Sequence, residues 1–224
     1  ESSFSTRMRR FRPLVTPTVN EKERFTSAPP AKSGTMKILF VQTGGTIDKD
    51  YPRTTNGQGF EIGDPAFLRL LERLNPSFNY EVHTVCQKDS LEITDACRET
   101  MLEEIGDLLE KAASNGSDFD GVVVTHGTDT MAETARFLGT NARFTKRNPA
   151  PGIVVTGAMR PERFTDSDAD CNLGMAIAAV QTVPAGFVGI CMHGLVLSHD
   201  EIGRDLGTGK FFREAGAEGA PRER

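Results

Sequence analysis

Residues 37–47 read KILFVQTGGTI, an apolar run of strand length followed at once by two glycines and a threonine. Residues 121–130, GVVVTHGTDT, repeat the arrangement with a second apolar run and a second threonine–glycine loop. β-Branched and aromatic residues favour strands, and glycine and threonine after such a run indicate a turn. Because ligands bind outside the carboxyl ends of the strands in an open parallel sheet, the two loops are expected to face each other across a small pocket. Two hydroxyls placed in this way can act on a carbonyl, which points to a hydrolase.

The rest of the chain alternates between apolar runs and helical patterns. Further strands are predicted at 80–86, 152–157 and 187–192. Helices are predicted to begin at the N-cap Asp64 before Pro65, at Thr94, and at the capping-box spacing Thr130-x-x-Glu133, with a last helix near 171–183. This alternation predicts the α/β class: a doubly wound, mainly parallel sheet of about five strands in a Rossmann- or flavodoxin-like three-layer sandwich.

The chain is expected to divide into three parts. Residues 36–213 are predicted to form the α/β domain. Residues 1–35 are basic and proline-containing and predict a disordered leader, with a targeting segment as the alternative. Residues 214–224 predict a disordered tail. Within the domain, the polar stretch 48–63 is interpreted as a lid or binding loop.

Composition excludes several classes of function. The net charge is −5: residues 1–35 hold seven basic and three acidic residues, and the remainder holds 19 basic and 28 acidic residues, so the acidic body argues against nucleic-acid binding. No apolar stretch approaches the ~20 residues that cross a bilayer, so no membrane association is expected. Four cysteines without a Cys-x-x-Cys pair indicate neither a zinc site nor a disulfide framework, and favour a cytoplasmic location. The acidic run 166–170 lacks the pattern of a calcium loop, so no metal is expected.

The segment Gly44-Gly45-Thr46 can present a hydroxyl beside unshielded backbone amides, because glycine adopts positive φ and lets a ligand approach closely. The spacing matches neither a dinucleotide fingerprint nor a phosphate loop, which weakens a nucleotide-binding reading. A nucleophile with an adjoining oxyanion site is one interpretation. A tight turn whose hydroxyl caps neighbouring amides is the other.

The second loop carries a carboxylate at a helix start. Asp129 can bind a cationic amine there, or serve as an N-cap together with Thr130. His126 follows a buried strand and is interpreted as a structural histidine, since no Gly-x-Ser-x-Gly elbow accompanies it. Ser90, in the turn after the second strand, can meet a ligand carboxylate or act as an ordinary turn hydroxyl.

Three motifs together carry a family resemblance: TGGTI at 43–47, THGTDT at 125–130 and GAMRP at 157–161. They resemble the bacterial-type L-asparaginase family from about Met36 to Phe212, over the N-terminal domain only; the smaller C-terminal asparaginase domain is expected to be absent, as in the short-chain, single-domain members. The resemblance implies hydrolysis of L-asparagine, a small-molecule substrate, to L-aspartate and ammonia, with glutaminase side activity. It implies no cofactor, and a homodimer or homotetramer.

The same resemblance implies a role for each matching residue. Thr46 would be the nucleophile that forms an acyl-enzyme, and Thr128 the helper hydroxyl. Asp129 would bind the substrate α-ammonium and Ser90 its α-carboxylate. The backbone would supply the remaining contacts: amides of Gly45 and Thr128 for the oxyanion, the Ala158 carbonyl for the leaving nitrogen, and Gly127 as a further substrate-binding position.

Two positions depart from the family pattern. Phe60 stands where many members carry a loop tyrosine, and Tyr51 is assigned that catalytic role instead. Arg204 stands at the catalytic lysine, and arginine cannot lose its proton as a base must, although it can stabilise negative charge. These departures leave a second hypothesis open, a weakly active or inactive asparaginase-like module that binds an amino acid.

Overall fold

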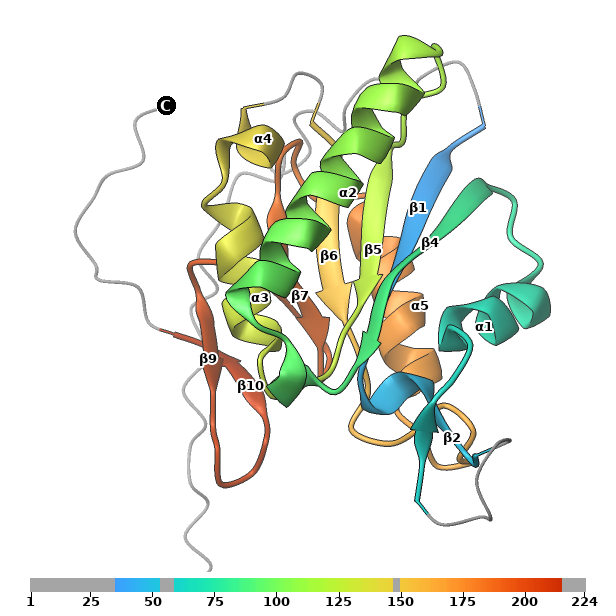
Figure 1. The fold of residues 1–224 in the computed structure, drawn as a ribbon, viewed down its shortest axis with the longest axis vertical. Coiled ribbons are helices and arrows are strands. Elements are labelled where there is room, and N and C mark those ends of the chain that lie inside the picture. The colour runs from blue at the N-terminus through green and yellow to red at the C-terminus, as the bar shows by residue number, and fades with distance from the viewer. Residues whose placement is uncertain (1–34, 53–58, 147–149, 215–224) are drawn as a thin grey trace, which may run out of the picture. The chain divides into compact units, whose positions relative to one another are not determined.

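The computed structural model describes residues 35–52, 59–146 and 150–214. Apart from Thr35 and Glu214, the predicted leader and tail lie outside these residues, as does the middle of the 48–63 loop. Within them, a six-stranded sheet forms the centre of the domain, in the order β4-β1-β5-β6-β7-β8 (Figure 1). Its strands are β1 (Lys37–Gly44), β4 (Asn79–Lys88), β5 (Gly121–Thr125), β6 (Gly152–Thr156), β7 (Val188–Met192) and β8 (Leu195–Ser198).

The first five of these strands are parallel, and β8 adds to β7 in the antiparallel sense. Numbered along the chain, the parallel strands lie in the order 2-1-3-4-5, which is the flavodoxin-like order. The prediction of a doubly wound, mainly parallel sheet is therefore confirmed. The order reverses between β1 and β5, so the switch point lies between the two threonine–glycine loops.

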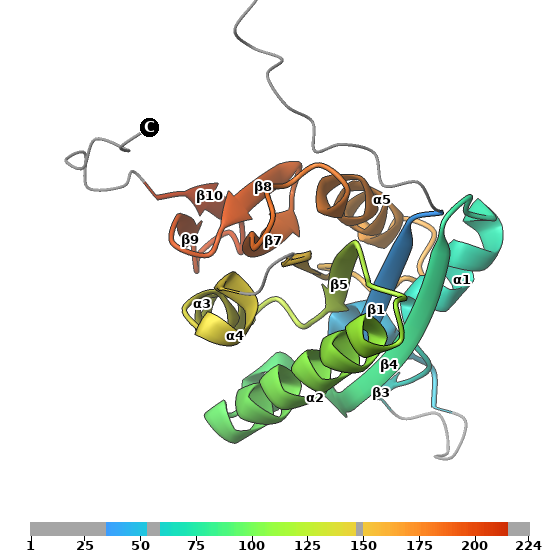
Figure 2. The same cartoon turned by 90° about the horizontal axis from the view of Figure 1, so that it is seen from above.

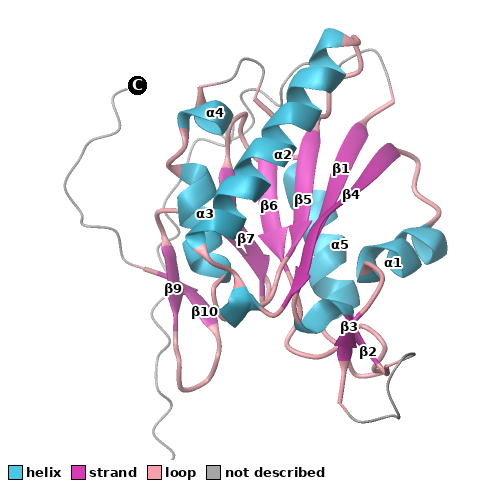
Figure 3. Ribbon diagram, in the orientation of Figure 1, coloured by secondary structure: helices cyan, strands magenta, loops and turns pink. Residues whose placement is uncertain are grey.

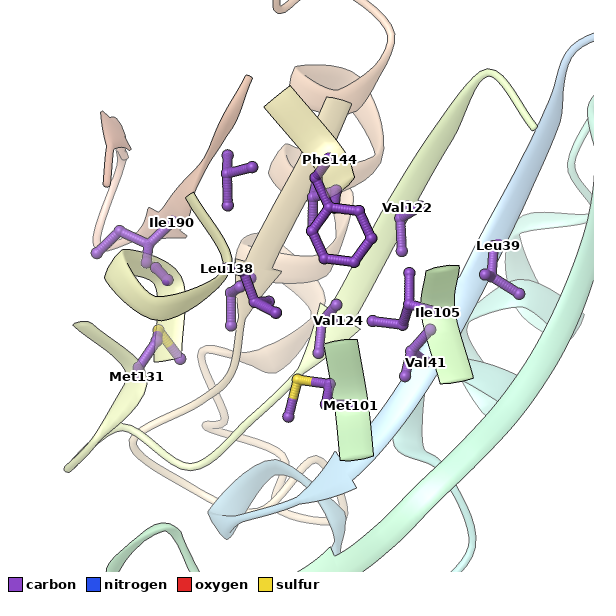
Figure 4. Close-up of a cluster of buried hydrophobic side chains, with 14 of the residues drawn as sticks. Leu39, Val41, Met101, Ile105, Val122, Val124, Met131, Leu138, Phe144 and Ile190 are labelled. Atoms are coloured by element: carbon purple, nitrogen blue, oxygen red, sulfur yellow. The ribbon is translucent and has the colours of Figure 1, made fainter. Parts of the chain in front are cut away.

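Helices cover both faces of the sheet (Figure 2). On one face lie α2 (Asp95–Ser114), α3 (Met131–Gly139) and α4 (Ala142–Thr145); on the other lie α1 (Ala66–Leu74) and α5 (Ala169–Val180). Alternate residues of each strand point to opposite faces. Leu39 and Val41 accordingly join the cluster under α2 and α3 (Figure 4), whereas Ile38 and Phe40 join the cluster under α1 and α5.

Short elements extend beyond the carboxyl ends of the parallel strands (Figure 3). They are two single-turn 3-10 helices, η2 (Thr46–Asp48) and η3 (Ser90–Glu92), and two small hairpins, β2 (Lys49–Asp50) with β3 (Glu61–Ile62) and β9 (Ile202–Arg204) with β10 (Phe211–Arg213). None of these was predicted, because two or three residues carry no readable periodicity.

The helix starts test three capping predictions. Thr94 caps α2 as expected, since its hydroxyl accepts a hydrogen bond from the Cys97 N–H. The cap at Asp64 is wrong: α1 begins at Ala66, whose N–H bonds the Asp48 carboxylate at 2.7 Å. Thr130 is the N-cap residue of α3, as predicted, but the capping box is wrong, because the Thr130 hydroxyl donates to the Ser90 carbonyl at 2.6 Å and makes no capping bond to the helix.

Two further findings bear on the composition arguments. Among the helices that the structure describes, none has both the length and the apolar character needed to cross a membrane. All four cysteines fall within the described residues and are free.

Candidate active site

The loop after β1 is shaped by two glycines. Gly44 and Gly45 have φ of 102° and 87°, which favours glycine over any residue with a Cβ. The Gly45 N–H donates to the Lys88 carbonyl at 2.9 Å, which fastens the loop to the end of β4. Thr46 then opens η2 with a partly exposed side chain, and among the described residues neither its hydroxyl nor its N–H has a hydrogen-bond partner.

This bond corrects one expectation. Gly45 was expected to supply an oxyanion N–H, but that N–H is already bonded to Lys88. The unpartnered Thr46 N–H, the first of the 3-10 turn, takes its place as the candidate donor. The sequence could not show this, because the acceptor lies on a strand 43 residues further along the chain.

The loop after β5 lies directly against the loop after β1. A Cβ built on Gly45 would stand 2.3 Å from the backbone of Gly127, so the two loops are in direct contact at these glycines. The Thr43 hydroxyl donates to the Thr125 carbonyl at 2.8 Å and ties the two strand ends together. The two loops are therefore neighbours, as predicted, but at these glycines they are in direct contact and not separated by a pocket. Thr128 is 7% exposed, and its hydroxyl has no partner within the described residues.

Ser90 and Asp129 form a bonded pair next to this contact. Ser90 is 1% exposed, and its hydroxyl accepts the Asp129 N–H at 3.1 Å while facing the Asp129 carboxylate at 3.4 Å. A Cβ on Gly127 would stand 2.6 Å from that of Ser90. The turns after β4, β1 and β5 therefore meet at one place.

Arg204 reaches this place from the β9–β10 hairpin. Its Nη2 lies 2.9 Å from Oδ1 of Asp129 in an ion pair, with the arginine side chain 14% exposed and the carboxylate 45% exposed. Its guanidinium also stands over the Phe211 ring, at 5.5 Å from the ring centre. The position that the resemblance gives to a base thus holds a cation paired with Asp129.

The loop after β6 closes another side. The His126 N–H donates to the Thr156 carbonyl at 2.8 Å, and Gly157 packs against the His126 backbone. Ala158 is fully buried. The Asp168 carboxylate accepts the N–H groups of Met159 and Arg160, which fixes the backbone beyond Ala158.

His126 is a structural residue, as predicted. It is fully buried, with Nδ1 2.7 Å from the Gly127 carbonyl and Nε2 3.0 Å from the Thr134 hydroxyl. Burial lowers the pKa of its imidazole to about 4, so the ring is neutral at physiological pH.

Tyr51 is not drawn into this cluster. Its side chain is 66% exposed and its ring lies 5.2 Å from that of Phe60, which in turn contacts Phe164. Its hydroxyl has no hydrogen-bond partner in the described part of the chain. Its catalytic assignment stays a prediction.

Asp48 is a buried acid near the candidate site that sequence reasoning missed. It is 1% exposed, two residues after Thr46, and its carboxylate accepts from the Ala66 N–H and, at 3.1 Å, from the Gln42 amide. Burial raises the pKa of this carboxyl to about 7. The signal available in the sequence was a single acid after an apolar residue in TID, which is also typical of a surface turn.

No group of three metal-binding side chains occurs among the residues that the structure describes. The polar groups at the switch point are hydroxyls, backbone amides and one carboxylate–guanidinium pair. Such a set can attack a carbonyl and hold a charged ligand. Fold and site together define a doubly wound α/β protein with its candidate chemistry at the switch point.

Comparison with known proteins identifies the family. The family described as "Asparaginase, N-terminal" matches residues 37–204, so the chain belongs to the asparaginase family of hydrolases. It is 32% identical over 177 residues to a glutaminase-asparaginase of Acinetobacter glutaminasificans, covering 77% of this chain and 49% of that protein. It is also 37% identical over 102 residues to a glutamyl-tRNA(Gln) amidotransferase subunit of Aeropyrum pernix, covering 46% of this chain and 23% of that protein.

A solved structure agrees with these sequence matches. The thermostable L-asparaginase from Thermococcus kodakarensis superposes with a TM-score of 0.61 at 27% identity, over 80% of this chain and 51% of that one. The chain thus spans about half the length of the asparaginase and glutaminase-asparaginase that it matches.

Proposed function

We propose that this protein is an amidohydrolase that converts L-asparagine to L-aspartate and ammonia through a threonine nucleophile. The observation that carries the proposal is the pair of unpartnered threonine hydroxyls, Thr46 and Thr128, on two described loops that touch at the switch point. Membership of a family with asparaginase and glutaminase-asparaginase members supports the same reaction.

The proposed reaction has two steps. The Thr46 oxygen attacks the side-chain amide carbon, the carbon–nitrogen bond breaks, and ammonia leaves with the hydroxyl proton. Water then cleaves the resulting ester, which releases aspartate and restores the hydroxyl. The N–H groups of Thr46 and Thr128 would stabilise the oxyanion of each intermediate, and the Thr128 hydroxyl would assist proton movement.

The remaining site residues would hold the substrate. Asp129 would bind the α-ammonium, with Ser90 adding a hydroxyl at the carboxylate end. The Gly127 backbone would border the substrate, and the Ala158 carbonyl would accept the amide nitrogen. Tyr51 would take the catalytic role that a loop tyrosine has in many family members. No cofactor is needed for these steps.

Glutamine is the expected side substrate. It differs from asparagine by one methylene, and a pocket discriminates such a difference by only ~1–3 kcal/mol. We also propose that the protein is cytoplasmic, which is in keeping with its four free cysteines.

A second candidate function is an amino-acid-binding module of a larger assembly. The cation at position 204 favours it, because arginine cannot serve as the base that a lysine provides. The relative named as an amidotransferase subunit favours it as well.

Ammonia release from asparagine by the purified chain decides between the two. Thr46→Ala is expected to abolish turnover, whereas Thr100→Ala, on the exposed side of α2, serves as the matched control and keeps it. Equal rates for wild type and Thr46→Ala, with asparagine still bound in calorimetry, would establish the binding module instead.

A further inference from the structure

The guanidinium of Arg204 has unused hydrogen-bonding capacity at the site. Of its three nitrogens, Nη2 bonds Asp129, and Nε is shielded from solvent without a hydrogen-bond partner among the described residues. Leaving a buried donor unpaired is unfavourable, so such a group is expected to have a partner when the protein works.

The hairpin fixes this guanidinium in place. Arg204 lies directly opposite Phe211 in the β9–β10 register, and that ring is 3% exposed beneath the guanidinium. The neighbouring Asp205 does not compete for it, because its carboxylate accepts from the N–H groups of Gly207 and Thr208 in its own turn.

Two other basic side chains near the loops are bonded elsewhere. Lys49 pairs with Asp89 at 2.8 Å, and the Lys88 ammonium bonds the Cys97 sulfur at 3.2 Å. Ser90 is uncharged, and its hydroxyl is already bonded to Asp129. Among these basic side chains, Arg204 is therefore the one that lies beside Asp129 and has an N–H group, at Nε, without a hydrogen-bond partner in the described residues.

We propose that Arg204 binds the α-carboxylate of the substrate while Asp129 binds the α-ammonium, so that this ion pair recognises the zwitterionic end of a free amino acid. A guanidinium presents its donors in a planar fork that matches a carboxylate. A carboxylate and a guanidinium side by side also match the charges of an α-amino acid. The inference rests on the proposed amide hydrolysis and narrows it to free amino-acid amides, which excludes asparagine within a peptide.

Truncated substrates test this assignment. β-Alaninamide is asparagine without its carboxylate, and succinamate is asparagine without its ammonium. Loss of the carboxylate is expected to lower kcat/KM of the wild type about 10- to 100-fold, the usual effect of a hydrogen bond to a charged group. Arg204→Met should lower kcat/KM for asparagine by the same factor, mainly through KM, and leave β-alaninamide nearly unchanged.

Matched variants separate recognition from general damage. Arg204→Lys keeps the charge and should lie between the wild type and Arg204→Met. Arg213 lies in the same hairpin, and its guanidinium is paired with Glu201. Arg213→Met should therefore leave kcat/KM unchanged for both asparagine and β-alaninamide. Asp129→Asn should instead erase the preference for asparagine over succinamate.

Equal losses for asparagine and β-alaninamide in Arg204→Met would overturn the proposal, since Arg204 would then act on the reaction or the fold. If no amide is hydrolysed above the Thr46→Ala background, the proposed function fails, and binding decides the inference separately. Calorimetry on Thr46→Ala and Thr46→Ala/Arg204→Met must then show a preference for asparagine over β-alaninamide in the first protein that disappears in the second. The assignment is refuted if Thr46→Ala shows no preference for asparagine, or if Thr46→Ala/Arg204→Met keeps that preference.

Discussion

At the scale of single residues, Asp48 makes the free energy of unfolding depend on pH. The pKa of its carboxyl rises from 3.8 to about 7 because the group is buried, and the N–H of Ala66 and the Gln42 amide offset this only in part. Because the folded state holds the proton more tightly, this group contributes stability below about pH 4 and loses it as pH rises to 7. The loss is at most roughly 4 kcal/mol.

Urea denaturation of the wild type and Asp48→Asn between pH 4 and 8 measures this effect. The variant cannot titrate at this position, so the stability difference between the two proteins should move against the wild type as pH rises. Two curves that stay parallel over the range would show that Asp48 does not titrate there.

A second single-residue prediction concerns Gly45, where the contact between the two loops leaves no room for a side chain. Gly45→Ala would place a Cβ 2.3 Å from the Gly127 backbone at a φ of 87°, so strain and overpacking combine. We expect destabilisation of roughly 2–5 kcal/mol and loss of turnover, because the backbone cannot yield as a flexible side chain does.

Thermal unfolding compares this variant with Gly174→Ala. Gly174 lies in α5 with nothing within 4 Å of a built Cβ, so alanine there should be neutral or stabilising. A Gly45→Ala protein that melts with the wild type would contradict the close contact.

At the scale of elements, the junction of β4 and α2 creates an acidic thiol. The pKa of Cys97 falls to about 7, chiefly through the hydrogen bond from the Thr94 hydroxyl and further through Lys88, whereas burial raises that of Cys86 to about 11. Iodoacetamide at pH 7 should therefore modify Cys97 much faster than Cys86, because the thiolate is the nucleophile.

Peptide mass spectrometry over a range of pH follows this reaction site by site. Lys88→Met should move the midpoint for Cys97 upward, and Lys111→Met, near the other end of α2, should not. Equal rates at Cys97 and Cys86 would refute the difference in pKa.

At the scale of the whole molecule, we propose a homodimer or homotetramer. Several large apolar side chains lie exposed beyond the carboxyl ends of the strands: Tyr51 at 66%, Phe60 at 46% and Leu206 at 87%. Light scattering at assay concentrations should give two or four times the chain mass of 24.4 kDa. A fully active species of one chain mass would exclude it.

The parallel sheet and the meeting of the two threonine loops were predictable because each rests on a local pattern. Strand residues 37–42 and 121–125 are apolar enough to be buried on both faces, and parallel strands end on the same edge. The order of the strands was not predicted; the structure places β1 beside β5, which brings Thr43 against Thr125.

What sequence reasoning missed depends on partners that are distant along the chain. The Gly45 N–H bonds Lys88, Arg204 pairs with Asp129, and the Thr130 hydroxyl bonds Ser90. The first and third of these bonds occupy groups that had been given other roles, and the second joins two residues that are 75 positions apart in the sequence. Asp48 was overlooked for the same reason, since its burial is produced by α1 rather than by its own segment.

The β9–β10 hairpin places the proposed substrate-recognition residue on a different element from the loops that carry the reactive hydroxyls. The loops that carry Thr46 and Thr128 are continuous with the central sheet, whereas Arg204 arrives on a small ribbon outside it. From the proposed role of Arg204 we therefore expect that substitutions at this residue alter substrate recognition without disturbing the strands that position the hydroxyls. For an engineer, the hairpin is the part to exchange when a different amide is wanted.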